Sequence, residues 1–189
     1  MKISILTLFP EMFQGPFDYS IIKNAQEKKK VIVEFINIRD FGIGRHKVVD
    51  DKPYGGGHGM ILRVDVLDAA ISKAKGSPCG EAGENPQVLG QKIVLLSPHG
   101  KTFNQEKARE FSKLKHLILV CGRYEGVDER VKKNIDEELS IGDFVVTGGE
   151  VPAMLITDAI VRLIDGVLKE GVTANESFSL PAARLPDGQ

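Results

Sequence analysis

Short runs of apolar, mostly β-branched residues recur along the chain, and each run has the length of one strand. Several of these runs are apolar at nearly every position, which is typical of strands that are covered on both faces of a sheet. The predicted strands cover residues 3–9, 31–38, 92–98, 116–122 and 144–149.

The segments between these runs have apolar residues at the three- or four-residue spacing of a helix face. The predicted helices cover residues 18–30, 64–75, 104–114 and 151–164. Asn104 is a good N-cap for the third helix, and Pro152 falls in the first turn of the fourth, where proline is tolerated. Since helices alternate with strands, the pattern predicts an α/β fold with a mostly parallel sheet.

Composition adds little to this picture but excludes some classes of protein. The 189 residues are 42% hydrophobic and 27% charged, as in a globular domain of moderate size. The net charge of -1 does not indicate a nucleic-acid binder, so any such role would rest on local patches. Cys79 and Cys121 are far apart, which argues against a disulfide scaffold or a zinc site and fits a reducing cytoplasm. We find no signal-peptide pattern and no apolar stretch that approaches the length of a membrane span.

Two phosphate-binding signatures begin in the sequence, and neither is completed. Residues 42–47, GIGRHK, start like a dinucleotide-binding fingerprint, but Lys47 stands where the third glycine should be. Residues 99–102, HGKT, end like a P-loop, but the first glycine of that motif would fall at Leu95. The sequence therefore argues against a conventional NAD enzyme and against a P-loop NTPase.

Three predicted strands lead into glycine-containing loops, SPHGK at 97–101, GRYEG at 122–126 and TGGE at 147–150. In parallel α/β sheets, ligands bind at the carboxyl ends of the strands, and glycines there let a ligand reach backbone N–H and C=O groups. The loops could form the walls of a pocket for a flat polar group such as adenine. The alternative, which the residues leave open, is that each glycine serves a turn or the C-cap of a helix.

A polar segment of about 20 residues, 39–60, has no secondary-structure pattern, and such long segments inside compact domains are usually functional or disordered. Its cations could hold phosphates, and Asp50 and Asp51 could accept hydrogen bonds from the N–H groups of a base. The alternative is a solvated loop whose charges cancel. The charge cluster at 123–130 has a sufficient structural explanation as the start of a helix.

Five segments taken together resemble the bacterial tRNA (guanine-N1)-methyltransferases, the TrmD family. They are LFPEMF at 8–13, RDFG to GGGHGM at 39–60, LSPHGK at 96–101, LVCGRYEGVDERV at 119–131 and the segment 140–168. The resemblance runs from residue 1 to about residue 178, in order and with natural spacing. It implies a SPOUT-class α/β fold with a deep trefoil knot in the C-terminal half. It also implies a homodimer with each active site at the subunit interface.

The resemblance further implies methyl transfer from S-adenosylmethionine to N1 of the guanosine at position 37 of tRNA, in the cytoplasm. Members of the family commonly depend on Mg²⁺, although the sequence shows no evident metal cage. The three glycine-containing loops correspond to the family's cofactor pocket. The corresponding residues are Leu95, Leu96, Ser97, Pro98, Gly122, Tyr124, Glu125, Ile141, Gly142, Asp143, Phe144, Val145, Val146, Gly148, Gly149 and Pro152.

The catalytic residues that the resemblance implies are Glu176 and Arg162. Removal of the guanine N1 proton calls for a base, and Glu176, in NESF, stands where the family has an aspartate. Arg162 could stabilise charge that develops on guanine O6 or bind a phosphate, and its spacing also allows an intrahelical pair with Asp158. The target guanine is expected to lie against the YGGGHGM segment. The implied substrate-binding residues are Asp50, Gly55, Gly56, Gly57, His58 and Gly59.

We expect residues 1–168 to form the methyltransferase domain and 169–189 to form an interdomain linker with a short, atypical tail. The end of the chain, SLPAARLPDGQ, does not resemble the family, in which a helical C-terminal domain follows, so we expect that domain to be absent. An alternative function is therefore a catalytically impaired, truncated form that only binds S-adenosylmethionine or RNA.

Overall fold

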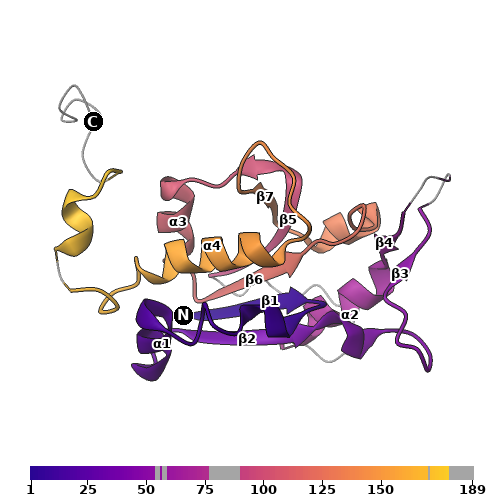
Figure 1. Cartoon of the computed structure of the whole chain (residues 1–189), viewed down its shortest axis with the longest axis horizontal. Helices are drawn as coiled ribbons and strands as arrows, with labels where there is room; N and C mark the ends of the chain where they lie inside the picture. Colours follow the sequence, from indigo (N-terminus) through magenta and orange to yellow (C-terminus); the bar gives the residue numbers. More distant parts are fainter. Residues whose placement is uncertain (54–55, 57–58, 77–89, 170, 179–189) are drawn as a thin grey trace.

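The computed structural model of the protein describes residues 1–53, 56, 59–76, 90–169 and 171–178. Its main strands are β1 (Lys2–Thr7), β2 (Ile32–Asn37), β5 (Gln91–Thr102), β6 (His116–Cys121) and β7 (Glu137–Ser140). Together they form one sheet in the order β2-β1-β6-β5-β7, in which every pair of neighbours is parallel (Figure 1). The predicted α/β fold with a parallel sheet is thus confirmed.

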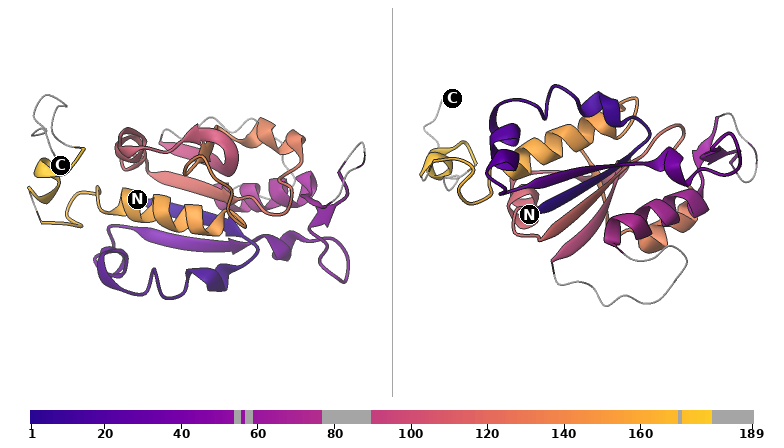
Figure 2. Two further views of the ribbon diagram at one scale, coloured as in Figure 1. Left: turned by 45° about the horizontal axis from the view of Figure 1, so that its top comes forward. Right: turned by 90° about the horizontal axis from the view of Figure 1, so that it is seen from below.

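Helices cover both faces of this sheet (Figure 2). They are α1 (Ser20–Glu27), α2 (Val64–Lys75), α3 (Gln105–Phe111) and α4 (Glu150–Val161), with the 3-10 helices η1 (Pro10–Phe13), η2 (Ile38–Phe41), η3 (Glu129–Asn134) and η4 (Val172–Asn175). A short antiparallel ribbon pairs β3 (Asp50–Asp51) with β4 (Ile61–Leu62). In the described ranges, the helices are all too short or too polar to cross a membrane.

Each face of the sheet has its own buried core, because alternate side chains of a strand point in opposite directions. On β1, Ile3 and Ile5 join the cluster formed with α1, α3 and α4, whereas Leu6 joins the cluster formed with α2. On α2, Leu67 and Ile71 lie one turn apart, and both are buried against the sheet. These two cores explain why the strands are apolar at nearly every position.

The predicted strand at 144–149 is wrong, and the strand β7 lies a few residues earlier. Val145 is 83% exposed and Phe144 is 57% exposed, so this apolar run faces outward instead of pairing in the sheet. The sequence prediction misses β7 because the strand is short and carries glutamates, of which Glu137 forms an ion pair with Lys92. Hydrophobicity alone does not separate a charged edge strand from an exposed apolar loop.

The predicted helices form, with ends that differ by a few residues at most positions. Asn104 caps α3 as expected, since its Oδ1 accepts a hydrogen bond from the Lys107 backbone N–H at 2.9 Å. Pro152 lies in the first turn of α4. The segment 39–60, which shows no pattern in the sequence, contains part of η2, the strand β3 and a one-residue antiparallel bridge.

Strand β5 contains an irregularity that shapes one side of the site. Its pairing with β7 shifts register between Leu96 and Lys101, which both pair with Leu139. Gly100 is required in this bulge, because a Cβ there would lie 2.5 Å from the Leu139 backbone nitrogen. Residues 97–100 therefore bulge out of the ladder beside the carboxyl end of β6.

Candidate functional site

A cavity of about 310 Å³ lies at the carboxyl end of β6, beside residues 95–99 in the middle of β5. It is enclosed by this part of β5, by the loops that follow β6 and β7, by η3 and by the first turn of α4. The predicted cofactor residues that line it are Leu95, Leu96, Ser97, Pro98, Gly122, Tyr124, Glu125, Ile141, Phe144, Val145, Val146, Gly148, Gly149 and Pro152. Gly142 and Asp143 belong to the same loop as Phe144, but the lining does not include them.

The loops approach one another so closely that two points of the cavity wall require glycine. A Cβ on Gly149 would lie 2.6 Å from the Cα of Cys121, and a Cβ on Gly122 would lie 2.9 Å from the carbonyl oxygen of Leu96. The Gly149 backbone N–H also donates a hydrogen bond to the Gly122 carbonyl oxygen at 2.9 Å. These glycines therefore serve the close packing of backbone against backbone, and neither is only a turn or a C-cap.

A buried ion pair ties three segments of the chain together beside the cavity. Glu150 is 1% exposed and accepts hydrogen bonds from Arg123 Nε at 2.9 Å and from the Thr7 hydroxyl at 2.8 Å. The Arg123 guanidinium also lies 4.6 Å from the centroid of the Phe9 ring and donates to the Thr147 carbonyl oxygen. Sequence reasoning missed this pair, because its members are 27 residues apart. One feature of the sequence could have indicated a buried charge here, because Glu150 is the first residue of a helix that is otherwise mostly apolar.

The chemistry of the cavity is mixed, with buried leucines of β5 and β7 in its floor and carboxylates in its walls. Lys132 forms ion pairs with Glu129 at 2.9 Å and Glu138 at 3.0 Å, and the hydrogen bonds raise the pKa of Lys132. The Glu125 carboxylate forms no ion pair within the described part of the chain. No cluster of three or more histidine, cysteine or carboxylate side chains suited to a metal ion occurs among the described residues. Backbone edges, apolar surface and carboxylates together suit a flat ligand that carries positive charge.

Two of the predicted substrate residues, Asp50 and Gly59, lie beside residues that line the cavity. Burial raises the pKa of the Tyr124 hydroxyl, and the charge and hydrogen bond of the nearby Asp50 raise this pKa further. Gly59 packs on Glu125, where a Cβ would lie 2.5 Å from the glutamate Cγ. Gly56 has a φ of +82°, in the left-handed region that favours glycine. The other predicted substrate residues lie outside the described residues: Gly55, Gly57 and His58.

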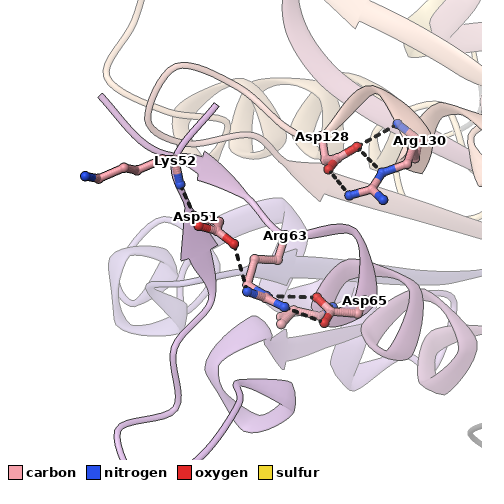
Figure 3. A network of polar contacts seen from close by, with 7 residues as sticks. Asp51, Lys52, Arg63, Asp65, Asp128 and Arg130 are labelled. Carbon is pink, nitrogen blue, oxygen red and sulfur yellow. Dashed lines mark hydrogen bonds and ion pairs between the residues drawn. The ribbon is translucent and has the colours of Figure 1, made fainter. Parts of the chain in front are cut away.

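Two groups of ion pairs lie in the segments next to the predicted substrate residues, one around Arg63 and one around Arg130 (Figure 3). Arg63 donates to Asp65 through Nε and Nη2 and to Asp51 through Nη1, at 2.9–3.1 Å. The Arg63 hydrogen bonds hold the pKa of the Asp65 carboxyl below its ordinary value. Arg130 donates to both carboxylate oxygens of Asp128, which also caps η3 by accepting from the Arg130 backbone N–H. This part of the charge cluster thus stabilises a helix start, as predicted.

The predicted catalytic pair lies at the opposite end of α4 from the cavity, because Arg162 is the C-cap of this helix and the cavity is lined by its first turn. Figure 1 shows residues 171–178 beyond the C-terminal end of α4. Arg162 donates hydrogen bonds to both carboxylate oxygens of Glu176, one of them at 2.9 Å from Nη1 to Oε2. These bonds hold the pKa of the Glu176 carboxyl below its ordinary value. Pro152 in the cavity wall and Arg162 are separated by roughly 15 Å along the helix, at 1.5 Å per residue. Arg162 therefore pairs with Glu176 and not with Asp158, and neither member of the pair lines the cavity.

Comparison with known proteins places these features in a family. The chain matches the family model described as tRNA (Guanine-1)-methyltransferase TrmD over residues 1–187. A protein of Dictyoglomus turgidum named tRNA (guanine-N(1)-)-methyltransferase is 52% identical over 168 residues, which are 89% of this chain and 64% of that protein. A protein of the same name from Clostridium beijerinckii is 54% identical over 179 residues, which are 94% of this chain and 70% of that protein.

A solved structure is similar over most of the described fold. The crystal structure of tRNA (m1G37) methyltransferase from Aquifex aeolicus has a TM-score of 0.74 and 37% sequence identity, and the match covers 90% of this chain and 72% of that chain. This chain spans only 64% of the length of the Dictyoglomus turgidum relative and 70% of the Clostridium beijerinckii relative. Given the family match from residue 1 to residue 187 and identities of about half to these relatives, the chain belongs to the tRNA (guanine-1)-methyltransferase family, TrmD.

Proposed function

We propose that the chain transfers a methyl group from S-adenosylmethionine to N1 of the guanosine at position 37 of tRNA. The observation that carries this proposal is the cavity, which is formed by the loops that carry the family's motifs. The relatives are named for methylation of guanine N1, and the Aquifex aeolicus structure is named for position 37.

The cavity residues fit S-adenosylmethionine in size and in chemistry. A cavity of about 310 Å³ is within the usual range for small-molecule sites. Gly122 and Gly149 let the glycine-containing loops of the cavity wall pack in direct backbone contact. The carboxylate of Glu125, which forms no ion pair among the described residues, favours a cofactor that carries positive charge. When bound there, the cofactor supplies an activated methyl group.

Glu176 is the proposed general base, and it takes the proton from guanine N1. A neutral N1–H is a poor nucleophile, so removal of this proton makes the nitrogen reactive. The hydrogen bonds from Arg162 lower the pKa of Glu176, which keeps the carboxylate in the ionised form that accepts a proton. A guanidinium has five N–H donors, so Arg162 can also stabilise the negative charge that develops on guanine O6.

We further propose a homodimer in which Glu176 and Arg162 of one chain complete the cavity of the other. Within one chain, this pair lies at the far end of α4 from the cavity, so a second chain is needed to bring base and cofactor together. An exposed apolar surface supports association: Val151 and Leu155 on α4 are 49% and 48% exposed, and Val145 is 83% exposed. Val151 and Leu155 are four residues apart and so lie on one face of α4, and exposed apolar side chains that are grouped in this way are typical of a protein interface.

Several finer parts of the proposal rest on family membership. They are the deep trefoil knot in the C-terminal half, the dependence on Mg²⁺ and the cytoplasmic location. The division into a methyltransferase domain at 1–168 and a linker with a tail at 169–189 is likewise proposed.

The activity is tested with labelled S-adenosylmethionine and tRNA transcripts that carry guanosines at positions 36 and 37, with and without Mg²⁺. We expect label in N1-methylguanosine, and no label when position 37 is adenosine. A folded chain that binds the cofactor in calorimetry but transfers no methyl group would overturn the proposal. That outcome would favour the alternative function, a form that only binds S-adenosylmethionine or RNA.

The shared site is tested by co-expression of two inactive variants. Glu176→Gln removes the base, and Ser97→Trp fills the cavity with an indole. If base and cavity come from different chains, a mixed dimer holds one intact site and activity returns. If both come from one chain, mixing restores nothing and the shared site is rejected.

A further inference from the structure

Three consecutive lysines project from the turn between α1 and β2. Lys28, Lys29 and Lys30 are all exposed, and none of them forms an ion pair with a carboxylate among the described residues. By contrast, Lys23 on α1 pairs with Glu27, at 3.9 Å. Three adjacent positive charges repel one another, and no ion pair among the described residues offsets this repulsion.

Hydrogen bonds hold the backbone of this turn in one conformation. The N–H groups of Lys29 and Lys30 donate to carbonyl oxygens in the last turns of α1, both at 2.9 Å. The Met1 nitrogen donates to the Lys30 carbonyl oxygen at 2.9 Å, which ties the turn to the start of β1. Lys29 has a φ of +56°, an uncommon conformation for a residue other than glycine. The three side chains therefore extend from a fixed backbone rather than from a slack loop.

The turn lies beside the segment that carries the proposed catalytic pair. A Cβ on Gly166 would lie 3.0 Å from the Lys30 Nζ, so the chain that follows α4 passes against this turn. Figures 1 and 2 show α1, the end of α4 and residues 171–178 at the same end of the molecule. The lysines thus share this end with Arg162 and Glu176.

Stabilisation of α1 explains only part of this arrangement. A positive charge near a helix C-terminus is favourable, but the effect falls off within the last turn. Lys28 follows α1 directly and satisfies that requirement. The two further lysines add repulsion without a described partner, which points to an anion from outside the chain.

We propose that Lys28, Lys29 and Lys30 bind phosphates of the RNA chain whose target guanosine is served by Glu176. This inference rests on the proposed function and deepens it by naming a surface that holds the RNA backbone. A lysine ammonium is a compact charge with three N–H donors, which suits a phosphate and reads no base. The turn therefore positions the RNA and adds salt-dependent affinity, while the choice of base stays with the cavity.

The test is a comparison of two double variants of the full chain. K28Q/K29Q removes two charges from the turn, and K73Q/K75Q removes two exposed charges from the end of α2, on the other face of the sheet. Binding of tRNA is measured by fluorescence anisotropy at several salt concentrations. Each lost phosphate contact reduces the slope of log K against log salt by roughly 0.7 to 0.9, so K28Q/K29Q should lose about 1.5. The control should keep the wild-type slope.

An unchanged slope of log K against log salt in K28Q/K29Q overturns the inference. If the melting temperature of this variant also falls, the lysines serve the stability of α1. Equal loss of slope in both variants also overturns it, because the effect would then be one of net charge. If wild type transfers no methyl group but the slope falls only in K28Q/K29Q, the proposed function fails and the RNA surface stands.

Discussion

The two ends of the sheet are built from different kinds of interaction. At the carboxyl end, the cavity wall depends on backbone packing at Gly149 and on a carboxylate, Glu150, that is almost fully buried. At the other end, the pair of Arg162 and Glu176 is partly exposed, as are the charges around the start of β1. Buried groups determine the shape of the cavity end, and partly exposed charges occupy the other end, where we propose that the catalytic pair lies.

This difference predicts which substitutions change stability and which change activity. Removing Glu150, the almost fully buried member of its ion pair, leaves the largely buried guanidinium of Arg123 without a carboxylate partner, so the cost is high. An exposed pair is solvated whether or not it forms, so its loss costs little free energy of unfolding. We therefore expect substitutions at the cavity to have the larger effect on the free energy of unfolding. Substitutions of Arg162 and Glu176, at the C-terminal end of α4, should have the larger effect on turnover.

The largest expected effect is on turnover. Glu176→Gln should lower the single-turnover rate of methyl transfer by at least about 100-fold, because a general base contributes roughly that much or more. The melting temperature should stay at the wild-type value, since the carboxylate is partly exposed. Glu27→Gln, which removes a surface carboxylate from α1, is the control and should leave the rate unchanged. A Glu176→Gln enzyme within twofold of wild type would place the base elsewhere.

Next in size is the effect of Glu150→Gln on stability. The amide keeps the shape of the side chain but leaves Arg123 without its buried charge partner, so we expect a loss of about 3 kcal/mol in the free energy of unfolding. Urea denaturation measures this loss. The same change at Glu27, whose pair with Lys23 is exposed, should cost less than about 0.5 kcal/mol. If the two variants lose similar amounts of free energy of unfolding, the claim that buried charge stabilises the cavity end more than exposed charge stabilises the other end is wrong.

A smaller loss of stability is expected from Gly149→Ala. The new Cβ would meet the Cys121 Cα at 2.6 Å, so the backbone must shift at a cost of about 1–3 kcal/mol. Since the wall of the cavity moves, calorimetry should also show weaker binding of S-adenosylmethionine. Gly171→Ala is the control at the other end, where a left-handed φ of +84° adds strain but no atom lies within 4 Å. It should destabilise the fold without changing cofactor affinity.

The smallest expected effect is a pH dependence at the amino ends of the strands. Burial lowers the pKa of His116, and the charge of Lys2 lowers it further, while Glu34 opposes them. The His116 Nε2 lies 2.9 Å from the Ser4 hydroxyl oxygen, and the Nδ1 lies 3.3 Å from the Gln91 amide nitrogen. This network suits a neutral imidazole, in which one nitrogen donates and the other accepts.

The sign of this effect follows from the lowered pKa. The unfolded chain binds the His116 proton more readily than the folded chain, so stability is complete above the ordinary value of 6.5 and falls as the pH drops below it. Melting temperatures of wild type and His116→Gln, measured from pH 8 to pH 5, isolate this residue from the other histidines. The melting temperature of wild type should exceed that of His116→Gln by less at pH 5 than at pH 8. A difference that stays constant over this pH range would contradict the prediction.

Local pattern was enough to predict most of the fold. Helix α2 begins and ends at the predicted residues, 64 and 75, because its apolar spacing and the glycine that follows both act within a few residues. The glycine-containing loops were also identified correctly as neighbours, since parallel strands bring their carboxyl ends to one edge of a sheet. The motifs that carry the family resemblance are likewise short and continuous.

The errors and omissions involve residues that are distant in sequence. The apolar run at 144–149 is exposed, and only packing shows that β7 takes the place at the sheet edge. The partners of Glu150 come from β1 and from the loop after β6, which no local pattern connects. The pairing of Arg162 with Glu176 instead of Asp158 depends on how the chain turns back after α4.

The order of amino acids alone thus establishes the alternation of helices and strands, the loops that line the cavity and the family to which the chain belongs. Those features depend on hydrophobic period and short motifs, which are properties of neighbouring residues. Tertiary packing was needed to show that Gly122 and Gly149 are close backbone contacts, and that the proposed catalytic pair lies at the end of α4 remote from the cavity. The distance between two segments that are remote in sequence depends on how all the side chains of the two cores pack together. No single stretch of sequence determines such a distance.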